Sequence, residues 1–516
     1  MSLQTLSGIK LSVPVNENKL KTLAEKTLGG KLKHFAILKK SLDARDKNNL
    51  RFVYSIEFSK SEKPKAEPLP RLPVSRLPQK PVVIVGSGPA GLFAAIRLLD
   101  RGFAPIVVER GPCVEEREKK INAFSLSGQL DTDGNVQFGE GGAGTFSDGK
   151  LNTQTHSGLN SEVLSLFVRF GAPEEILYLN KPHIGSDNLK SVVRNMREFI
   201  LKSGGQVRFD TRLERIKREN GKLKTVFVKN LKTGVEEEIE PSSLILAIGH
   251  SARDTFAMLH ENGITMRQKE FAVGLRIEHK QAAIGLSQYG KSYPLLPPAD
   301  YKLVSHAAER AAFTFCMCPG GFVMPAASED GGVVVNGMSN YARDGENANS
   351  ALIAQVKAED FGSDCPLAGV ELQRKMERAA YLAGGSSYAA PAQLVKDFLV
   401  GKVSESYGEI QPTYPVGTVF ADLNALLPSK VAQALRLAIP DMDRRLKGFA
   451  FPEAVLTGVE TRTSSPVRIE RGDDLQSVSC QGLYPCGEGA GYSGGITSSA
   501  ADGLRVAERI YAVLAE

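Results

Sequence analysis

Three glycine-rich stretches are the parts of this chain whose residue types and spacing indicate chemistry. The first is Gly86-x-Gly88-x-x-Gly91, which lies between an apolar run at 82–85 and a helical pattern at 89–102. In such a strand–turn–helix, the first glycine makes the tight turn, the second lets a pyrophosphate approach the backbone, and the third allows close helix–strand packing. The N–H groups at the start of the helix then face the phosphates. The spacing predicts a dinucleotide site.

An acidic residue ends the next predicted strand. Residues 105–109 read as an apolar strand, and Glu109 lies 18 residues after Gly91. A carboxylate at this position can accept hydrogen bonds from ribose hydroxyls. Because strand, glycines, helix, second strand and acid occur in register, the segment predicts dinucleotide binding. It does not choose between NAD and FAD.

The other two glycine-rich stretches favour FAD. They are residues 139–153 and the C-terminal segment 483–504, and an apolar strand at 242–252 lies between them. This order resembles the FAD-binding two-dinucleotide-binding-motif flavoproteins of the glutathione-reductase and hydroxybenzoate-hydroxylase type. The resemblance implies that Gly487-Glu488 reaches the ribityl chain and that the glycines after it lie against the flavin ring. A helix beginning near Ile496 would turn its positive end to the flavin and stabilise the reduced form.

Four further segments carry a closer resemblance. Residues 181–198, 271–279, 315–349 and 458–469 are similar to the bacterial and plastid "FAD-dependent dehydrogenase" family, and the similarity runs along essentially the whole chain. No histidyl attachment motif is evident, so we expect FAD to be bound non-covalently. The motifs and the resemblance together predict these cofactor-binding residues: Gly86, Gly88, Pro89, Ala90, Gly91, Glu109, Arg110, Gly142, Gly144, Thr145, Asp148, Gly149, Lys150, Ala247, Gly249, Gly487, Glu488, Gly494, Gly495 and Ile496.

The expected fold class is α/β. We expect a Rossmann-like FAD-binding domain with an inserted α+β substrate domain and a small N-terminal α+β module. The predicted boundaries are 1–60 for the basic module, 61–80 for a proline-rich linker, 81–270 for the first part of the FAD-binding domain, 271–450 for the substrate domain and 451–516 for the C-terminal part of the FAD-binding domain.

The amino-acid composition excludes several classes of protein. The 516 residues are 42% hydrophobic and 24% charged, which is typical of a globular chain. The six cysteines are scattered, without disulfide-framework or zinc-type spacing, so we expect no metal site and a reducing compartment. Neither a signal peptide nor a membrane span is evident, and the prediction is a cytoplasmic protein with no membrane partner.

Positive charge is concentrated at the N-terminus. Residues 1–80 contain 17 Lys and Arg against 7 Asp and Glu, a net charge of +10 in a chain whose total is +6. A basic module of this kind could dock RNA or a protein partner. A solvated face on a small domain explains the same charge, and no recognised nucleic-acid motif is present.

Catalytic residues are not fixed by the motifs. The weak candidates are Tyr492, Arg462 and His250; Arg468 flanks the same turn as Arg462, and His183 and His306 read as structural. Cys316 and Cys318 form a Cys-x-Cys pair. A flavin-coupled disulfide is conceivable there, but we expect two small thiols packed in the core, because so short a ring is strained.

These features predict an FAD-dependent oxidoreductase. It would transfer a hydride between an unidentified organic substrate or NAD(P)H and bound FAD. No second strand–GxGxxG–helix unit occurs, so NAD(P)H, as a donor, would bind transiently in the substrate cleft. Two alternatives stay open: a flavoprotein that acts on or docks to RNA through its basic module, and a non-catalytic flavin redox sensor.

Overall fold

A five-stranded parallel sheet forms the centre of the FAD-type part of the molecule. The computed structural model describes residues 3–62, 80–153 and 157–515. The sheet has the order β22-β10-β4-β5-β6, and every neighbouring pair is parallel. Its strands are β4 (Val82–Val85), β5 (Ile106–Val108), β6 (Gln206–Arg208), β10 (Ser243–Leu246) and β22 (Leu483–Pro485). Parallel pairing brings the carboxyl ends of all five strands to one edge.

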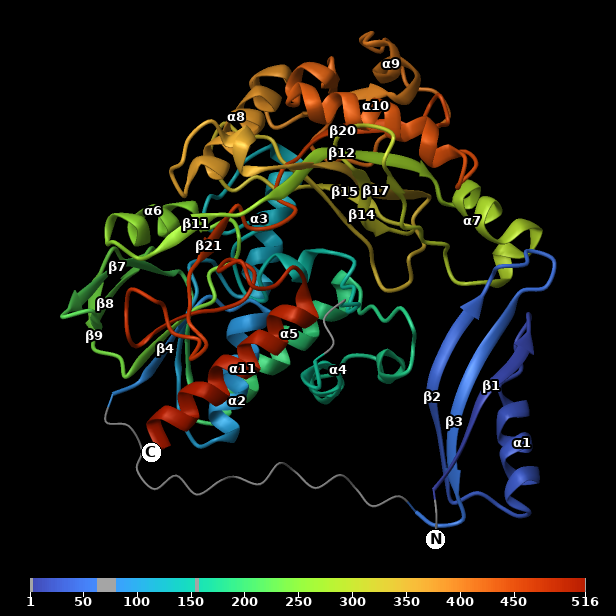
Figure 1. Cartoon of the computed structure of the whole chain (residues 1–516), viewed down its shortest axis with the longest axis horizontal. Coiled ribbons are helices and arrows are strands. Elements are labelled where there is room, and N and C mark those ends of the chain that lie inside the picture. Colours follow the sequence, from blue (N-terminus) through green and yellow to red (C-terminus); the bar gives the residue numbers. More distant parts are fainter. Residues whose placement is uncertain (1–2, 63–79, 154–156, 516) are drawn as a thin grey trace.

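Helices cover one face of this sheet, and a smaller sheet covers the other (Figure 1). The helices are α2 (Pro89–Asp100), α3 (Val114–Ser127), α4 (Leu159–Arg169), α5 (Ser186–Lys202) and α11 (Ile496–Ala515). A Cβ atom on Gly503 would lie 2.1 Å from the Ala90 carbonyl oxygen, so α11 and α2 approach closely because this residue is glycine. The other face holds β7 (Thr211–Glu219), β8 (Lys222–Asn230), β9 (Glu236–Ile239) and α6 (Arg253–Glu261).

The predicted substrate domain contains a seven-stranded mixed sheet of order β13-β14-β17-β12-β20-β18-β19. Its strands are β12 (Phe271–Lys280), β13 (Val304–Ser305), β14 (Ala312–Cys318), β17 (Asn347–Val356), β18 (Ala390–Leu394), β19 (Thr418–Phe420) and β20 (Val455–Glu460). Because β20 belongs to this sheet, the sheet extends past residue 450, where the sequence predicts the substrate domain to end.

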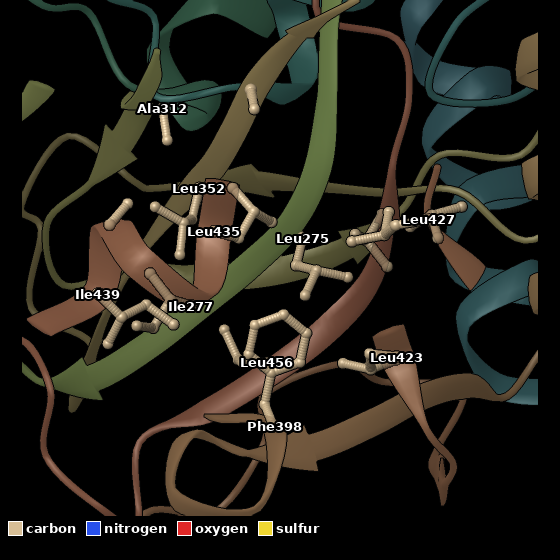
Figure 2. Close-up of a cluster of buried hydrophobic side chains, with 14 of the residues drawn as sticks. Leu275, Ile277, Ala312, Leu352, Phe398, Leu423, Leu427, Leu435, Ile439 and Leu456 are labelled. Carbon is tan, nitrogen blue, oxygen red and sulfur yellow. The ribbon is translucent and has the colours of Figure 1, made fainter. Parts of the chain in front are cut away.

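One continuous apolar core lies between one face of this sheet and three helices. Helices α8 (Ala368–Ala383), α9 (Val395–Val400) and α10 (Ser429–Asp443) pack over it. Figure 2 shows Leu435 of α10 beside Leu352 and Ile439 beside Ile277 of the strands. These side chains are fully buried. The helices therefore fix the strands whose ends form one wall of the site.

Shorter elements connect the two sheets. Strand β11 (Met266–Gln268) pairs antiparallel with β21 (Val467–Ile469), and β15 (Phe322–Pro325) pairs with β16 (Val335–Met338). Helix α7 (Gln281–Tyr289) follows β12. Among the described residues, no helix is both long and apolar enough to cross a membrane.

The N-terminal module is a three-stranded antiparallel sheet with one helix. It comprises β1 (Gln4–Ser12), α1 (Asn18–Leu28), β2 (His34–Asp43) and β3 (Arg51–Ser59), in the sheet order β1-β3-β2. The edge strand β2 docks on the main body, since the Lys40 N–H donates to the Tyr178 carbonyl at 2.8 Å and the Asn180 N–H donates to the Lys40 carbonyl at 3.0 Å. Residues 63–79 of the predicted linker lie outside the described residues.

Candidate active site

A cleft lies between the carboxyl edge of the parallel sheet and the end of the seven-stranded sheet. It holds about 1540 Å³ of empty space, part of it open to solvent. All but three of the predicted cofactor residues line it: Gly86, Gly88, Pro89, Ala90, Glu109, Arg110, Gly142, Gly144, Asp148, Gly149, Lys150, Ala247, Gly249, Glu488, Gly494, Gly495 and Ile496. Gly91, Thr145 and Gly487 do not line it, but Gly91 packs against Gly86 and Gly487 against Ala90, which do.

The three fingerprint glycines are required for different reasons. A Cβ atom on Gly86 would lie 2.3 Å from the Ala247 carbonyl oxygen, and one on Gly91 would lie 1.9 Å from the Gly86 carbonyl oxygen. Protein packing alone therefore excludes side chains at these two positions. At Gly88 the nearest atom of the described residues would be the Gly142 Cα at 3.8 Å, so these residues leave room there. The space beside Gly88, at the first turn of α2, fits an approaching phosphate.

The C-terminal glycines also form two groups, those that protein packing requires and those that lie beside open space. A Cβ atom on Gly489 would lie 2.3 Å from the Gly249 carbonyl oxygen, and Gly491 has a φ of +85°. In contrast, Cβ atoms on Gly494 and Gly495 would meet no atom of the described residues within 4 Å. Both residues line the cleft directly before α11. Packing among the described residues does not require glycine at these two positions, whereas a flat ring lying against this backbone would.

The Glu109 carboxylate connects several loops that line the cleft. Its Oε2 accepts hydrogen bonds from the Ser87 N–H at 2.8 Å and the Ser87 hydroxyl at 2.9 Å. Its Oε1 accepts from the N–H groups of Gly111 and Gly139, both at 3.0 Å. A carboxylate has roughly four lone-pair positions. Glu109 therefore joins three loops of the cleft, and little acceptor capacity is left for the ribose hydroxyls that it is predicted to bind.

The 139–153 loop is held by an ion pair from the substrate domain. The buried Asp148 carboxylate accepts from Arg343 Nε at 2.9 Å and also from its Nη2. Lys150 Nζ lies 3.7 Å from Asp148 Oδ2 and lines the cleft. The Asp148 carboxylate is thus occupied by Arg343, whereas the Lys150 ammonium group can bind a ligand in the cleft. Thr145 is buried behind the loop.

The C-terminal loop is positioned by an ion pair that the sequence analysis missed. Arg471 donates to both carboxylate oxygens of Asp502, at 2.9 Å and 2.7 Å, and the Gly487 N–H donates to the same carboxylate at 2.9 Å. Burial raises the pKa of the neighbouring Glu488 to about 7, and the positive charge of Lys269 opposes this shift. An acid among small residues in the segment SSAADGL was the only sequence signal for Asp502.

Two buried ion clusters support the opposite wall. Arg276 donates to Glu460 at 2.8 Å, and both side chains are buried. Glu377 accepts from Arg253 at 2.7 Å and from Arg462 at 2.9 Å, and it joins α6, α8 and the end of β20. Burial alone would raise the pKa of Glu377, but the two guanidinium groups hold it well below its usual range. Of these five residues, only Arg462 was predicted at the site.

The three catalytic candidates have different outcomes. Arg462 and His250 line the cleft. Burial, together with Arg462 and Arg253, lowers the pKa of His250 to about 3, so this imidazole is neutral at pH 7 and is a weak base. Its Nδ1 lies 3.0 Å from the Ser251 hydroxyl.

Tyr492 does not line the cleft. Its ring lies next to the guanidinium groups of Arg471, 3.8 Å from the ring centroid, and Arg468, at 4.6 Å. Its hydroxyl accepts the Arg471 N–H at 3.0 Å. The structure therefore does not bring Tyr492 into the cleft, and the residue braces the C-terminal loop. His183 stacks on a tyrosine ring outside the cleft, and His306 is exposed elsewhere.

Comparison with known proteins divides the chain into three parts. Residues 4–59 match a domain of unknown function, residues 80–281 match the pyridine nucleotide-disulphide oxidoreductase family, and residues 270–463 match the family described as FAD-dependent protein, C-terminal domain-like. An uncharacterized protein of Clostridium beijerinckii is 45% identical over 501 residues, which cover 92% of this chain and 91% of the relative.

Solved structures give more distant similarities. A flavin-dependent brominase is 14% identical over 84% of this chain and 79% of its own, with a TM-score of 0.39. Glycerol-3-phosphate dehydrogenase from Bacillus halodurans, solved with FAD, is 12% identical over 85% of this chain and 64% of its own, with a TM-score of 0.36. The FAD-type family matches and the clostridial relative, which spans nearly the whole chain, show that this chain belongs to a family of FAD-dependent oxidoreductases.

Proposed function

We propose that the protein transfers a hydride from an organic donor or NAD(P)H to non-covalently bound FAD. The observation that supports this most directly is the free space at Gly88, Gly494 and Gly495, where no contact among the described residues requires glycine. Bound FAD would supply the two-electron chemistry. The N–H groups at the start of α2 would hold its pyrophosphate, and the start of α11 would face its flavin ring.

The chain's own residues order and enclose this site. Glu109 fixes the loops at the dinucleotide end, and Asp502 with Arg471 fixes the loop after β22. The wall formed by β14, β16 and β20 closes the other side, where Arg462 is held by Glu377. A donor would bind between that wall and the flavin. The neutral His250 can orient it by hydrogen bonding.

An anaerobic titration tests this proposal. The FAD-loaded protein is mixed with NADH, NADPH and a panel of alcohol, amine and hydroxy-acid donors while the visible flavin absorbance is followed. We expect one donor class to bleach the flavin, with a slower rate when the transferred hydrogen is deuterium. A protein whose flavin is bleached by dithionite but by none of these donors would contradict the proposal.

A second candidate function rests on the N-terminal module. Nine of its lysines are exposed: Lys10, Lys19, Lys21, Lys26, Lys31, Lys33, Lys39, Lys47 and Lys60. We propose that this surface docks RNA. A tRNA mobility shift that weakens as salt rises would support it, since phosphate contacts release counterions. The absence of any shift at low salt would exclude it.

A further inference from the structure

One polar side chain on the substrate wall of the cleft has no hydrogen-bond partner among the described residues. The other polar side chains of that wall already have hydrogen-bond or ion-pair partners. Glu460 and Asn336 accept from Arg276, Arg462 pairs with Glu377, Thr463 donates to the Ala272 carbonyl at 2.7 Å, and the Cys318 thiol donates to the Cys316 carbonyl at 3.3 Å. The remaining group is the Cys316 thiol, which lines the cleft and is exposed within it. The expectation that both cysteines pack in the core is wrong for Cys316.

The backbone presents Cys316 in an unusual way. The pairing of β14 with β17 shifts between Phe315 and Cys318, which marks a β-bulge, and Cys316 has a φ of +41°. This left-handed region is strained for a residue other than glycine. The bulge is stabilised by the Cys316 carbonyl, which accepts from the buried Arg276 Nη1 at 3.0 Å as well as from the Cys318 thiol. Bulges of this kind redirect a side chain beside active sites.

Cys318 lies two residues away and lines the same cleft. Its sulfur is buried and lies 4.0 Å from Arg276 Nη1. The cleft interior raises the pKa of both thiols, to about 12 for Cys316, and the charges of Lys150 and Arg276 oppose this shift. In the reduced state the pair is therefore protonated at neutral pH, and Arg276 is placed to stabilise a thiolate that forms on Cys318.

We propose that Cys316 and Cys318 form a redox-active dithiol–disulfide pair that takes two electrons from reduced FAD and passes them to a disulfide compound. This inference rests on the proposed function. The match to the pyridine nucleotide-disulphide oxidoreductase family ends at residue 281 and does not include these cysteines. A Cys-x-Cys ring is strained, and strained disulfides are readily reduced.

The reaction balances as follows. The Cys316–Cys318 disulfide accepts two electrons and two protons from FADH₂, its S–S bond breaks, and FAD and the dithiol form. The accessible Cys316 sulfur then attacks the external disulfide, forms a mixed disulfide and releases one thiol. Cys318 attacks the Cys316 sulfur, releases the second thiol and restores the internal disulfide. The net change is the oxidation of FADH₂ to FAD and the reduction of one disulfide to two thiols.

Anaerobic dithionite titration of the air-oxidised, FAD-loaded protein tests this pair. We expect the wild type to take up about four electrons per FAD, since the disulfide adds a second two-electron couple to the flavin. Cys316→Ser should take up about two electrons per FAD. Cys365→Ser removes an exposed cysteine outside the cleft and should behave like the wild type.

Thiol counting gives an independent result on the wild type alone. Alkylation under denaturing conditions followed by mass spectrometry should label all six cysteines in the reduced protein and two fewer in the oxidised protein, with Cys316 and Cys318 linked. Six free thiols in both states, with uptake of only about two electrons per FAD, would overturn the inference while leaving the proposed flavin chemistry intact. A protein without bleachable flavin would instead contradict the proposed function.

Discussion

Replacing Gly88 by alanine should separate cofactor binding from folding. Gly88 is the N-cap of α2, with φ −73° and ψ −176°, a conformation open to any residue. An added Cβ would come no closer than 3.8 Å to protein atoms. Alanine is a poorer N-cap than glycine, which lowers the free energy of unfolding, but it also reduces the conformational freedom of the unfolded chain, which raises it. Each effect is about 0.5–1 kcal/mol. The free energy of unfolding of the apoprotein should therefore change by less than about 1 kcal/mol.

The effect on FAD should be large. The Cβ would occupy the space beside the first turn of α2 and move a pyrophosphate away from the backbone N–H groups. Losing one or two charge-assisted hydrogen bonds costs about 2–5 kcal/mol, which corresponds to a loss of FAD affinity of roughly 30-fold or more. FAD titration followed by quenching of flavin fluorescence gives the Kd, and chemical unfolding of the apoprotein gives the stability.

Gly86→Ala is the matched control from the same motif. It combines a φ of +103° with a Cβ only 2.3 Å from the Ala247 carbonyl oxygen, so the apoprotein should lose about 2–6 kcal/mol of stability. If Gly88→Ala bound FAD within threefold of the wild-type Kd (roughly 0.7 kcal/mol), the placement of the pyrophosphate at α2 would be refuted.

Three further substitutions test other parts of the structure. Glu377→Ala leaves Arg253 and Arg462 buried without their carboxylate, and chemical unfolding should show a loss of about 3–5 kcal/mol. Glu377→Met restores side-chain volume but no charge, so it should recover little of this loss if the cost comes from the unpaired guanidinium groups; equal stability of Glu377→Ala and wild type would contradict the buried cluster. Because the pKa of Glu488 is raised to about 7, the folded apoprotein binds more protons than the unfolded chain between pH 4.5 and 7, and its stability should fall as pH rises through that window. Glu488→Gln should flatten this dependence. If the free energy of unfolding changed equally between pH 5 and pH 7 in the wild type and in Glu488→Gln, the result would argue against the shift in pKa. Leu435→Ala, in the fully buried core of Figure 2, should cost about 2–5 kcal/mol in unfolding without altering the Kd for FAD, and a changed Kd would mean that α10 acts on the site.

Local sequence patterns predicted the elements of the dinucleotide edge well. The strand at 82–85, the helix beginning at Pro89 and the helix beginning at Ile496 agree with β4, α2 and α11. Each of these depends on neighbouring residues: an apolar run, a glycine that allows a turn, and helical spacing. The parallel sheet then places their glycines at one edge because the carboxyl ends of its strands coincide.

The supporting contacts could not be predicted from one sequence. Arg253 and Glu377 are 124 positions apart, and Arg276 and Glu460 are 184 positions apart. Nothing in the local pattern of either pair indicates that they meet. The accessible position of Cys316 depends on a β-bulge in β14, and Tyr492 is turned from the cleft by its contacts with Arg468 and Arg471. These are outcomes of tertiary packing.

The most direct test of the account is the flavin content of the purified protein. The protein is incubated with excess FAD, desalted, denatured with acid and centrifuged, and the flavin in the supernatant is identified by chromatography and quantified by absorbance. The account predicts equimolar FAD released into the supernatant. A protein that retains no flavin after incubation would contradict FAD binding in the cleft, and flavin that stays with the precipitated chain would contradict the non-covalent mode.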